Sequence, residues 1–279
     1  MNLTTLVLGG GGSKGISVLG TLDYFYRKNL LEHIERISGT SIGSVIGALL
    51  GIGVSPADMF EVVKSVEVPL KGRLDYKKIL KKYGVWSLSK SLSPFLSFLI
   101  NHFGKSPTFE EYFSLTGVHL KVCASNLNKL EATYFDHIDY PDVKVTDALR
   151  ASCCIPGIFR AVKIKGQYYV DGGFVNNLPY DVWNHIPEEQ ILAITVSGTP
   201  PRQEIIDAMT YVSRIAHLAI ISKVRGTIKT KRRSIIVDTF LDDVPLIPTS
   251  VTKDQKNQIF KRGQLDAKTH LSKRVVTLD

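Results

Sequence analysis

The most informative stretch of the sequence is RISGTSIGSVIGALLGIGV, residues 36–54. It begins as a short strand pattern and ends as an apolar helix pattern, with Gly-Thr-Ser-Ile-Gly between the two. Gly-x-Ser-x-Gly in this setting is typical of a nucleophile elbow, a strained turn that exposes a serine hydroxyl. Flanking glycines remove side chains that would collide with the neighbouring strand and helix, and the helix N-terminus favours negative charge beside the serine. We therefore interpret Ser41 as a candidate nucleophile, supported by Gly39 and Gly43.

A second strand-to-helix junction lies at LVLGGGGSKG, residues 6–15, where an apolar run ends in four consecutive glycines. Bare backbone of this kind suits the phosphates of a nucleotide, the oxyanion of an acyl transfer or a tight turn. Gly10, Gly12 and Gly15 fit the Gly-x-Gly-x-x-Gly dinucleotide pattern, but its acidic residue should follow the second strand, whereas Glu35 precedes RISG. A Walker-type phosphate loop fits poorly, because glycine follows the lysine of this stretch. The dinucleotide interpretation is therefore the weaker alternative.

The glycine run instead suits a serine nucleophile, which needs hydrogen-bond donors for the oxyanion that develops during attack on a carbonyl. The unshielded N–H groups of Gly10, Gly11 and Gly12 are the candidates for these donors. A plain tight turn would need only one or two glycines. Lys14 either adds positive charge near the same turn or faces solvent.

The remaining requirement of a serine nucleophile is a base, and Asp171 is the best candidate. It ends the strand-like run QYYV and precedes Gly172 and Gly173, which clear space around the carboxylate. An α/β-hydrolase would place its serine late, before an acid and a histidine, but Ser41 comes early in this chain. The seven histidines show no recurring catalytic setting and are interpreted as surface or packing residues: His33, His102, His119, His137, His185, His217 and His270.

Strand and helix patterns alternate through the first fifty residues and again later, which predicts an α/β layer fold with a largely parallel sheet. The exception is KIKGQYYV, which predicts a hairpin turning at Lys165 and Gly166. Strands are expected at 4–9, 36–39, 119–125, 131–136, 161–164, 167–170, 191–197 and 234–240. Helices are expected from near Ser13 to Leu30, after Ser41, from Ser55, and at 75–83, 109–115, 146–153, 203–223 and 253–272.

One domain is the simplest organisation, with residues 1–200 as the catalytic part and residues 201–279 as a helical, basic extension packed on it. Residues 71–113 are interpreted as a cap-like insert, because they are rich in Lys, Ser and Leu and have no strand pattern. Within this insert, LSPFLSFLINHF (residues 92–103) is a candidate lining for an apolar channel or a membrane-facing element. An ordinary core or cap helix is the plain alternative.

The net charge of +9 is unevenly distributed over the 279 residues. Residues 71–82 hold six basic residues and one acid, and residues 223–233 hold six basic residues and no acid, so the rest of the chain is close to neutral. Such clusters favour an anionic lipid surface, although solvated faces or loops would look the same. Nucleic acid is not expected as a partner, because residues 223–233 lack aromatic side chains for base stacking.

Targeting and redox features are few. The N-terminus lacks a basic region and a cleavage pattern, and the longest nearly apolar run, residues 42–54, is too short to cross a bilayer. Cys123, Cys153 and Cys154 form neither a disulfide framework nor a metal-ligand spacing. We expect a cytoplasmic protein, at most peripheral to a membrane, with no cofactor and no metal.

Four blocks follow one another between about Leu6 and Gly198: GGGGSKG, GTSIG, ASCCIPGIF and VDGGFVNNLP. In their order and separation they resemble the patatin-like phospholipase family. The resemblance implies a three-layer α/β/α fold and a Ser-Asp dyad that hydrolyses lipid acyl esters of the phospholipase A type without a metal. Ser41 corresponds to the nucleophile and Asp171 to the base, and Gly10, Gly11 and Gly12 correspond to the oxyanion loop.

Two positions depart from the family pattern. Gly9 stands where the family often has aspartate, and Lys14 stands where arginine is commoner. Neither departure removes a catalytic atom. A catalytically silent lipid-binding or scaffold protein of the same fold remains an alternative.

Overall fold

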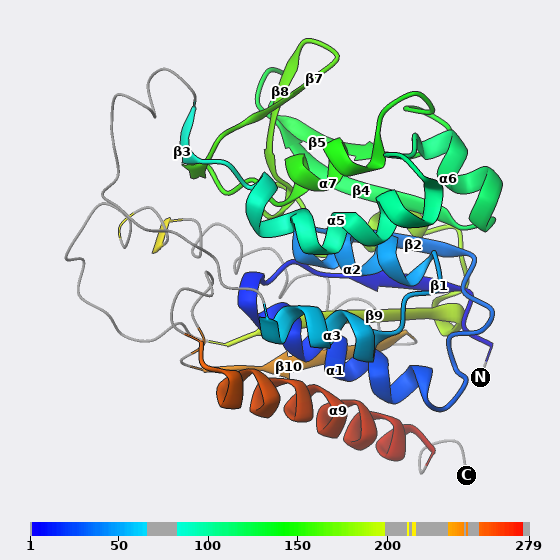
Figure 1. The fold of residues 1–279 in the computed structure, drawn as a ribbon. Helices are drawn as coiled ribbons and strands as arrows, with labels where there is room; N and C mark the ends of the chain where they lie inside the picture. Colours follow the sequence, from blue (N-terminus) through cyan, green and yellow to red (C-terminus); the bar gives the residue numbers. More distant parts are fainter. Residues whose placement is uncertain are drawn as a thin grey trace.

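The computed structural model describes residues 2–65, 83–198, 211, 214, 215, 234–242, 244 and 251–275. Within this part of the chain, eight strands form one mixed sheet (Figure 1). Its parallel members lie in the order β10 (Ile235–Phe240), β9 (Ile191–Ser197), β1 (Thr5–Leu8), β2 (Arg36–Thr40) and β4 (His119–Asn126). Antiparallel pairing adds β5 (Glu131–Phe135) and β8 (Gln167–Asp171) to β4, and β7 (Val162–Ile164) to β8. The predicted fold class, an α/β fold with a largely parallel sheet, is confirmed.

The central strand β1 is apolar along its whole length because both of its faces are covered, as is usual for parallel strands. Leu6 and Leu8 pack into the main core with α1 (Gly15–Tyr26), α2 (Ile42–Leu50), α7 (Val145–Ser152) and α9 (Lys253–Val275). Val7 points to the opposite face, where it packs with Tyr180 and Trp183 of the segment that contains the short helix η3 (Asp181–Trp183). The sheet therefore lies between two layers, as a three-layer fold requires.

Helices α1 and α9 pack unusually closely. A Cβ on Gly20 of α1 would lie 2.0 Å from the carbonyl oxygen of Phe260, and a Cβ on Gly263 of α9 would lie 2.0 Å from that of Ser17. The side chain of Thr21 donates a hydrogen bond of 3.1 Å to the Gly263 carbonyl. The two glycines thus let the backbones touch, and α9 covers the side of α1 that faces away from α2.

The other described elements surround this core. They are α3 (Pro56–Ser65), α5 (Ser89–Phe103), α6 (Phe109–Thr116), the small parallel pair β3 (Gly84–Trp86) and β6 (Gly157–Phe159), and the short helices η1 (Gly12–Lys14), η2 (Gly172–Phe174) and η4 (Glu188–Gln190). The expected start of a helix at Ser55 is confirmed, since the Ser55 hydroxyl accepts a hydrogen bond of 3.1 Å from the Asp58 amide. The hairpin at Lys165 and Gly166 is also confirmed, with positive φ at both residues.

Two sequence expectations are wrong, and one short strand was not predicted. The first helix ends at Tyr26 and does not reach Leu30 as expected. The interval 71–113 was expected to lack strands, but β3 lies within it. β6 was not predicted either, because three-residue strands are too short to show an alternating pattern.

Other expectations reach beyond what the structure describes. Residues 75–82 of the helix expected at 75–83 and most of the helix expected at 203–223 lie outside the described residues. The division into a catalytic part, an insert and an extension stays a prediction. Among the described helices, none combines the length and apolar character that a membrane span requires.

Candidate active site

Ser41 and Asp171 meet because two strands share one edge of β4. β2 pairs with β4 up to Thr40, opposite Cys123, and β8 continues along the same edge with Asp171 opposite Ala124. β5 occupies the other edge of β4. The end of β2 and the end of β8 therefore abut, and the residue after Thr40 faces the last residue of β8.

The turn at Ser41 has the strain expected of a nucleophile elbow. Ser41 has φ 52° and ψ −131°, a conformation that residues with a Cβ rarely adopt. A Cβ on Gly39 would lie 2.6 Å from Ser44 Cα, and one on Gly43 would lie 2.6 Å from the carbonyl oxygens of Leu8 and Gly9. Both glycines are therefore needed for the close approach of strand, turn and helix, as the sequence pattern indicated.

The side chains of Ser41 and Asp171 form a short hydrogen bond. Ser41 Oγ donates to Asp171 Oδ2 at 2.7 Å, and the Gly173 amide donates to Asp171 Oδ1 at 2.8 Å. Asp171 is only 2% exposed. Burial raises the pKa of Asp171 to about 6, against the opposing effect of the hydrogen bonds from Ser41 and Gly173. A carboxylate with a raised pKa beside a hydroxyl is suited to accept its proton.

The backbone on both sides of Asp171 is also held tightly. A Cβ on Gly172 would lie 2.3 Å from the carbonyl oxygen of Cys123, so only glycine lets η2 start against β4. The Ser125 hydroxyl donates to the Asp171 carbonyl at 2.7 Å. These contacts fix the carboxylate on the edge of β4.

Sequence reasoning missed Ser152, whose side chain forms a hydrogen bond with the backbone of the nucleophile. Its hydroxyl accepts a hydrogen bond of 2.8 Å from the Ser41 amide and donates one of 2.6 Å to the Cys123 carbonyl. Ser152 ends α7 inside the ASCCIPGIF block, and that block was the only sequence signal for it. The elbow is therefore bound to β4 through one side chain.

The glycine loop lies beside Ser41, but its three candidate donors differ. A Cβ on Gly10 would lie 3.0 Å from Ser41 Cβ, so this glycine leaves room for the nucleophile. The expectation that Gly10 donates to an oxyanion needs correction, because its N–H already donates to the Asn177 carbonyl at 3.1 Å. The amides of Gly11 and Gly12 have no hydrogen-bond acceptor within the described part of the chain. They are the donors that remain for an incoming carbonyl.

Lys14 is buried and joins the glycine loop to the chain segments that follow β9 and β10. It is 3% exposed, and its ammonium donates to the carbonyls of Leu241 at 3.0 Å and Gly198 at 3.5 Å, beyond the ends of β10 and β9. Burial lowers its pKa, against the opposing charges of Asp242 and Asp238. The alternative of a solvent-facing lysine is therefore wrong.

Gly15 supports the start of α1. A Cβ there would lie 2.7 Å from a side-chain carbon of Ile42, the first residue of α2. Its small size lets the two helix starts approach one another beside Ser41.

An apolar cavity of about 140 Å³ begins at Ser41 and Gly12 and extends between α1, α2 and α5. Its walls include Leu92 and Phe95 of α5, so the expected lining role of residues 92–103 is confirmed for these two side chains. The remaining wall is mainly aliphatic and aromatic, from Ile16, Leu19, Ile42, Ile46, Val63, Leu88, Ile155 and Phe159. The cavity suits a hydrocarbon chain whose polar end lies at Ser41.

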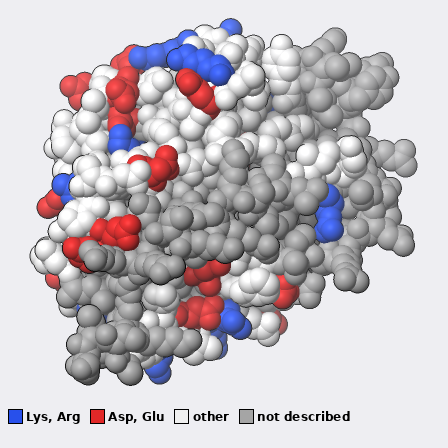
Figure 2. Space-filling view, turned by 180° about the vertical axis from the view of Figure 1, so that it is seen from behind, with Lys and Arg blue, Asp and Glu red and all other residues white. Residues whose placement is uncertain are grey.

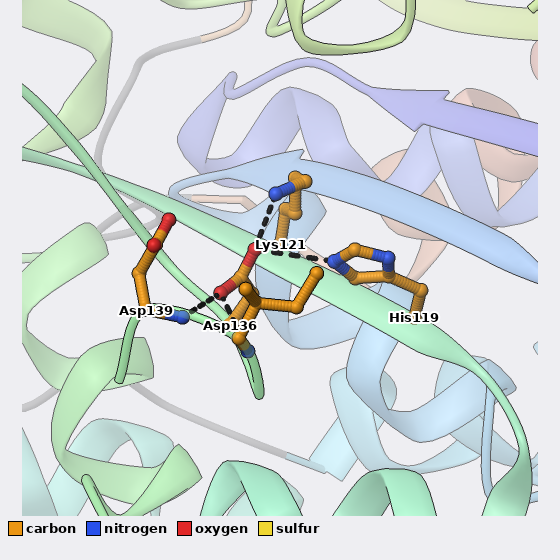
Figure 3. A network of polar contacts seen from close by, with 5 residues as sticks. His119, Lys121, Asp136 and Asp139 are labelled. Atoms are coloured by element: carbon orange, nitrogen blue, oxygen red, sulfur yellow. Dashed lines mark hydrogen bonds and ion pairs between the residues drawn. The ribbon is translucent and has the colours of Figure 1, made fainter. Parts of the chain in front are cut away.

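Among the residues that the structure describes, no histidine forms a hydrogen bond with Ser41 or Asp171. His119 instead joins Lys121 in binding the buried Asp136 (Figure 3). His119 pairs in register with Arg36 at the start of β2, the end opposite to Ser41. Although burial opposes it, hydrogen bonds from His119, the Asp139 amide and Lys121 hold the pKa of Asp136 well below its usual range. This network secures β4 and lies away from the nucleophile.

The structure also bears on metal and nucleotide sites. In the described residues, no group of three or more His, Cys, Asp or Glu side chains is arranged to hold a metal ion. Glu35 directly precedes β2 and lies beside Arg36, so it does not stand at the carboxyl end of that strand as a ribose-binding acid would.

Comparison with known proteins gives consistent results. The sequence model of the family described as "Patatin-like phospholipase" matches residues 6–182. "Probable lipid hydrolase 463L" of Invertebrate iridescent virus 6 is 31% identical over 212 residues, which are 72% of each chain. "Lysophospholipase nte1" of Aspergillus niger is 28% identical over 69% of this chain, but over only 12% of its own length. The crystal structure of VipD from Legionella pneumophila aligns with a TM-score of 0.62 at 17% identity, covering 98% of this chain and 67% of VipD.

Proposed function

Because this chain belongs to the patatin-like phospholipase family, we propose that it is a lipid acyl hydrolase in which Ser41 is the nucleophile and Asp171 the base. Family membership makes the protein a serine hydrolase that acts on ester bonds. The observation that carries the residue assignment is the 2.7 Å hydrogen bond from Ser41 Oγ to a buried carboxylate at the end of an apolar cavity.

Acylation would start when Asp171 Oδ2 accepts the hydroxyl proton while Ser41 Oγ attacks the ester carbonyl carbon. The carbonyl oxygen becomes an oxyanion, and the amides of Gly11 and Gly12 are the donors nearest at hand to stabilise it. Collapse of this intermediate breaks the ester bond, and Asp171 returns the proton to the departing alcohol. The product is an acyl group on Ser41 and a free alcohol.

Deacylation would follow the same path with water as the nucleophile. Asp171 accepts a proton from the water as it attacks the acyl carbonyl, and then returns the proton to Ser41 Oγ. A free fatty acid leaves and the enzyme is restored. Each step needs Asp171 ionised at its start, which its raised pKa permits above about pH 6.

The cavity supports a lipid substrate over a small polar ester. Its volume of about 140 Å³ resembles that of engineered protein cavities that take up benzene, so it would hold the first part of an acyl chain. We propose glycerolipids as substrates, cleaved at an acyl ester as by a phospholipase of type A. The headgroup would remain outside the cavity, on the side of Ser41 away from α5.

We further propose that an anionic membrane surface binds the two basic stretches, residues 71–82 and 223–233. Both stretches lie outside the described residues. Figure 2 shows acidic and basic side chains interspersed over the described part of one face, which agrees with a nearly neutral remainder of the chain. The proposal therefore rests on the distribution of charge along the sequence.

The central experiment compares the variants Ser41→Ala and Asp171→Asn with wild type on a short-chain soluble ester. Each variant should lose at least 10³-fold in turnover while remaining folded, since nucleophile and base are each required. The double variant should be scarcely worse than either single variant, because the two residues act as one unit. Asp142→Asn changes an exposed carboxylate and should leave turnover unchanged.

Labelling by a fluorophosphonate that reports covalently on the nucleophilic serine completes the test. Wild type and Asp142→Asn should be labelled at Ser41, and Ser41→Ala should not. Near-normal turnover by a folded Ser41→Ala variant would contradict the proposal. Lipid binding without any hydrolysis by wild type would instead favour the silent scaffold.

A further inference from the structure

Asn177 forms two hydrogen bonds with one residue of the glycine loop. Its backbone carbonyl accepts from the Gly10 N–H at 3.1 Å, and its side-chain Nδ2 donates to the Gly10 carbonyl at 3.2 Å. Asn177 is 2% exposed and follows Asp171 by six residues. A single buried residue therefore pairs both backbone groups of Gly10 and joins the glycine loop to the segment that carries the base.

The contact requires glycine at position 10. A Cβ there would lie 2.6 Å from Asn177 Oδ1, so the amide can lie flat against the loop only if residue 10 has no side chain. Asn177 Oδ1 is itself buried and has no hydrogen-bond partner in the described part of the chain. An unpaired buried amide oxygen is unfavourable for stability. Asn177 thus pairs both backbone groups of Gly10 while its own Oδ1 stays unpaired. This unfavourable arrangement favours a role in function over a role in stability.

The two bonds determine where the next amides point. The Gly9 N–H is fixed to the Ile194 carbonyl of β9 at 2.9 Å, and Gly10 is fixed to Asn177. The following two residues, Gly11 and Gly12, are those whose amides remain without an acceptor in the described chain. Donors held in place before the reaction stabilise an oxyanion without reorganisation.

We infer that Asn177 is a positioning residue that holds the glycine loop so that the Gly11 and Gly12 amides face the oxyanion formed at Ser41. This inference rests on the proposed hydrolase function. Asn177 touches the loop rather than the substrate, so its loss should affect the transition state more than substrate binding.

The test uses Asn177→Leu, which keeps the approximate size but removes the Nδ2 donor, and the neighbouring Asn176→Ala as its matched control. The Asn176 side chain donates to Tyr134 and Asp181, away from the loop. With a short soluble ester, Asn177→Leu should lower kcat about 100-fold, as loss of an oxyanion donor does, with KM within about threefold of wild type. Asn176→Ala should keep kcat within about threefold of wild type.

A ketone inhibitor separates positioning from general damage. Ser41 Oγ adds to the carbonyl carbon of an aliphatic trifluoromethyl ketone, Asp171 takes the proton, and the resulting oxyanion needs the same amides as the reaction. Its inhibition constant should therefore rise by the same factor as kcat falls in Asn177→Leu. Titration of active sites with a fluorophosphonate corrects both values for any misfolded fraction. If Asn177 had only a structural role, the corrected values would equal those of wild type.

A second variant, Asn177→Asp, retains the shape of the asparagine side chain and is used if the leucine variant does not fold. Its ionised carboxylate cannot donate to the Gly10 carbonyl, whereas its protonated carboxyl can. The loss of kcat relative to wild type should therefore shrink as the pH is lowered from 8 to 5.5. Kinetic constants per titrated site equal to those of wild type, or an unchanged inhibition constant, would overturn the inference while leaving the hydrolase intact. Absence of ester hydrolysis by wild type would overturn the proposed function and this inference with it.

Discussion

Asp171 must be ionised to accept a proton, yet it lies where water does not solvate its charge. Burial raises its pKa to about 6, and the Ser41 and Gly173 hydrogen bonds oppose a further rise. We therefore expect kcat/KM for an uncharged short-chain ester to be constant above about pH 7 and to fall about tenfold per pH unit well below 6. A profile that stays flat down to pH 5 would exclude Asp171 as the base.

The same burial makes Asp171 a source of instability at alkaline pH. The pKa is raised in the folded state, so the stability conferred by the protonated carboxyl is complete below about pH 4 and is lost as the pH rises through about 6. Asp171→Asn cannot ionise and should be more stable than wild type at pH 8, by about 3 kcal/mol. Urea denaturation at pH 8 and pH 5 checks this, since the difference should fall to about half of its pH 8 value at pH 5. A variant less stable than wild type at pH 8 would contradict it.

Several of these residue roles could be predicted from the sequence, because they need a particular residue type at a fixed spacing. The turn at Ser41 requires glycine at positions 39 and 43, so the pattern Gly-x-Ser-x-Gly identifies it in the sequence. Ser152 and Asn177 could not be found this way, because a single buried polar residue has no periodicity and acts through partners far away in the chain. The burial of Lys14 could not be predicted from the sequence, because the carbonyls that bind it come from residues 198 and 241.

At the scale of elements, the contact between α1 and α9 depends on two glycines. Alanine normally favours a helix over glycine by about 1 kcal/mol, so Gly263→Ala would stabilise an isolated α9. In the folded protein its Cβ would meet the Ser17 carbonyl, and the overpacking should lower the free energy of unfolding by about 1–3 kcal/mol. Urea denaturation measures the sign directly.

Leu265→Ala on the same helix is the matched control. Leu265 is 56% exposed, so its truncation should change the free energy of unfolding by no more than about 0.5 kcal/mol. Equal or higher stability of Gly263→Ala would show that α9 can move away from α1 without loss.

Periodicity predicted the longer elements, but it did not predict that β2 and β8 both lie along one edge of β4. The strand patterns at 36–39, 119–125 and 167–170 each indicate a strand, yet nothing in them says that β8 runs antiparallel and continues where β2 stops. That arrangement joins two residues 130 positions apart in the chain. Asp171 was selected as the base because it ends the run QYYV and precedes two glycines, and the family resemblance then supported its pairing with Ser41.

At the scale of the whole molecule, the proposed membrane contact depends on charges concentrated in two short stretches. Replacing Lys229, Lys231, Arg232 and Arg233 by glutamine should weaken sedimentation with anionic vesicles, because each basic residue near such a surface contributes roughly 1 kcal/mol before screening by salt. Hydrolysis of vesicle lipids should slow in parallel. Turnover of a small soluble ester should not change, since that reaction needs no interface.

A matched control removes three exposed lysines that already pair with acids. Lys105, Lys129 and Lys165 lie beside Glu111, Glu131 and Asp142, so their replacement by glutamine should leave vesicle binding nearly unchanged. Equal binding of wild type and the four-residue variant at low ionic strength would refute the membrane role of residues 223–233.

The positive φ of Ser41 also bears on the history of such proteins. A residue with a Cβ stores about 1–3 kcal/mol of strain in a sparsely populated backbone region, whereas glycine adopts positive φ freely. The proposed reaction requires the serine hydroxyl, which accounts for a side chain at this strained position. In a lineage that no longer hydrolyses lipids, a single change to glycine removes the nucleophile and relieves the strain together. A relative with glycine there would lack the nucleophile while keeping the fold.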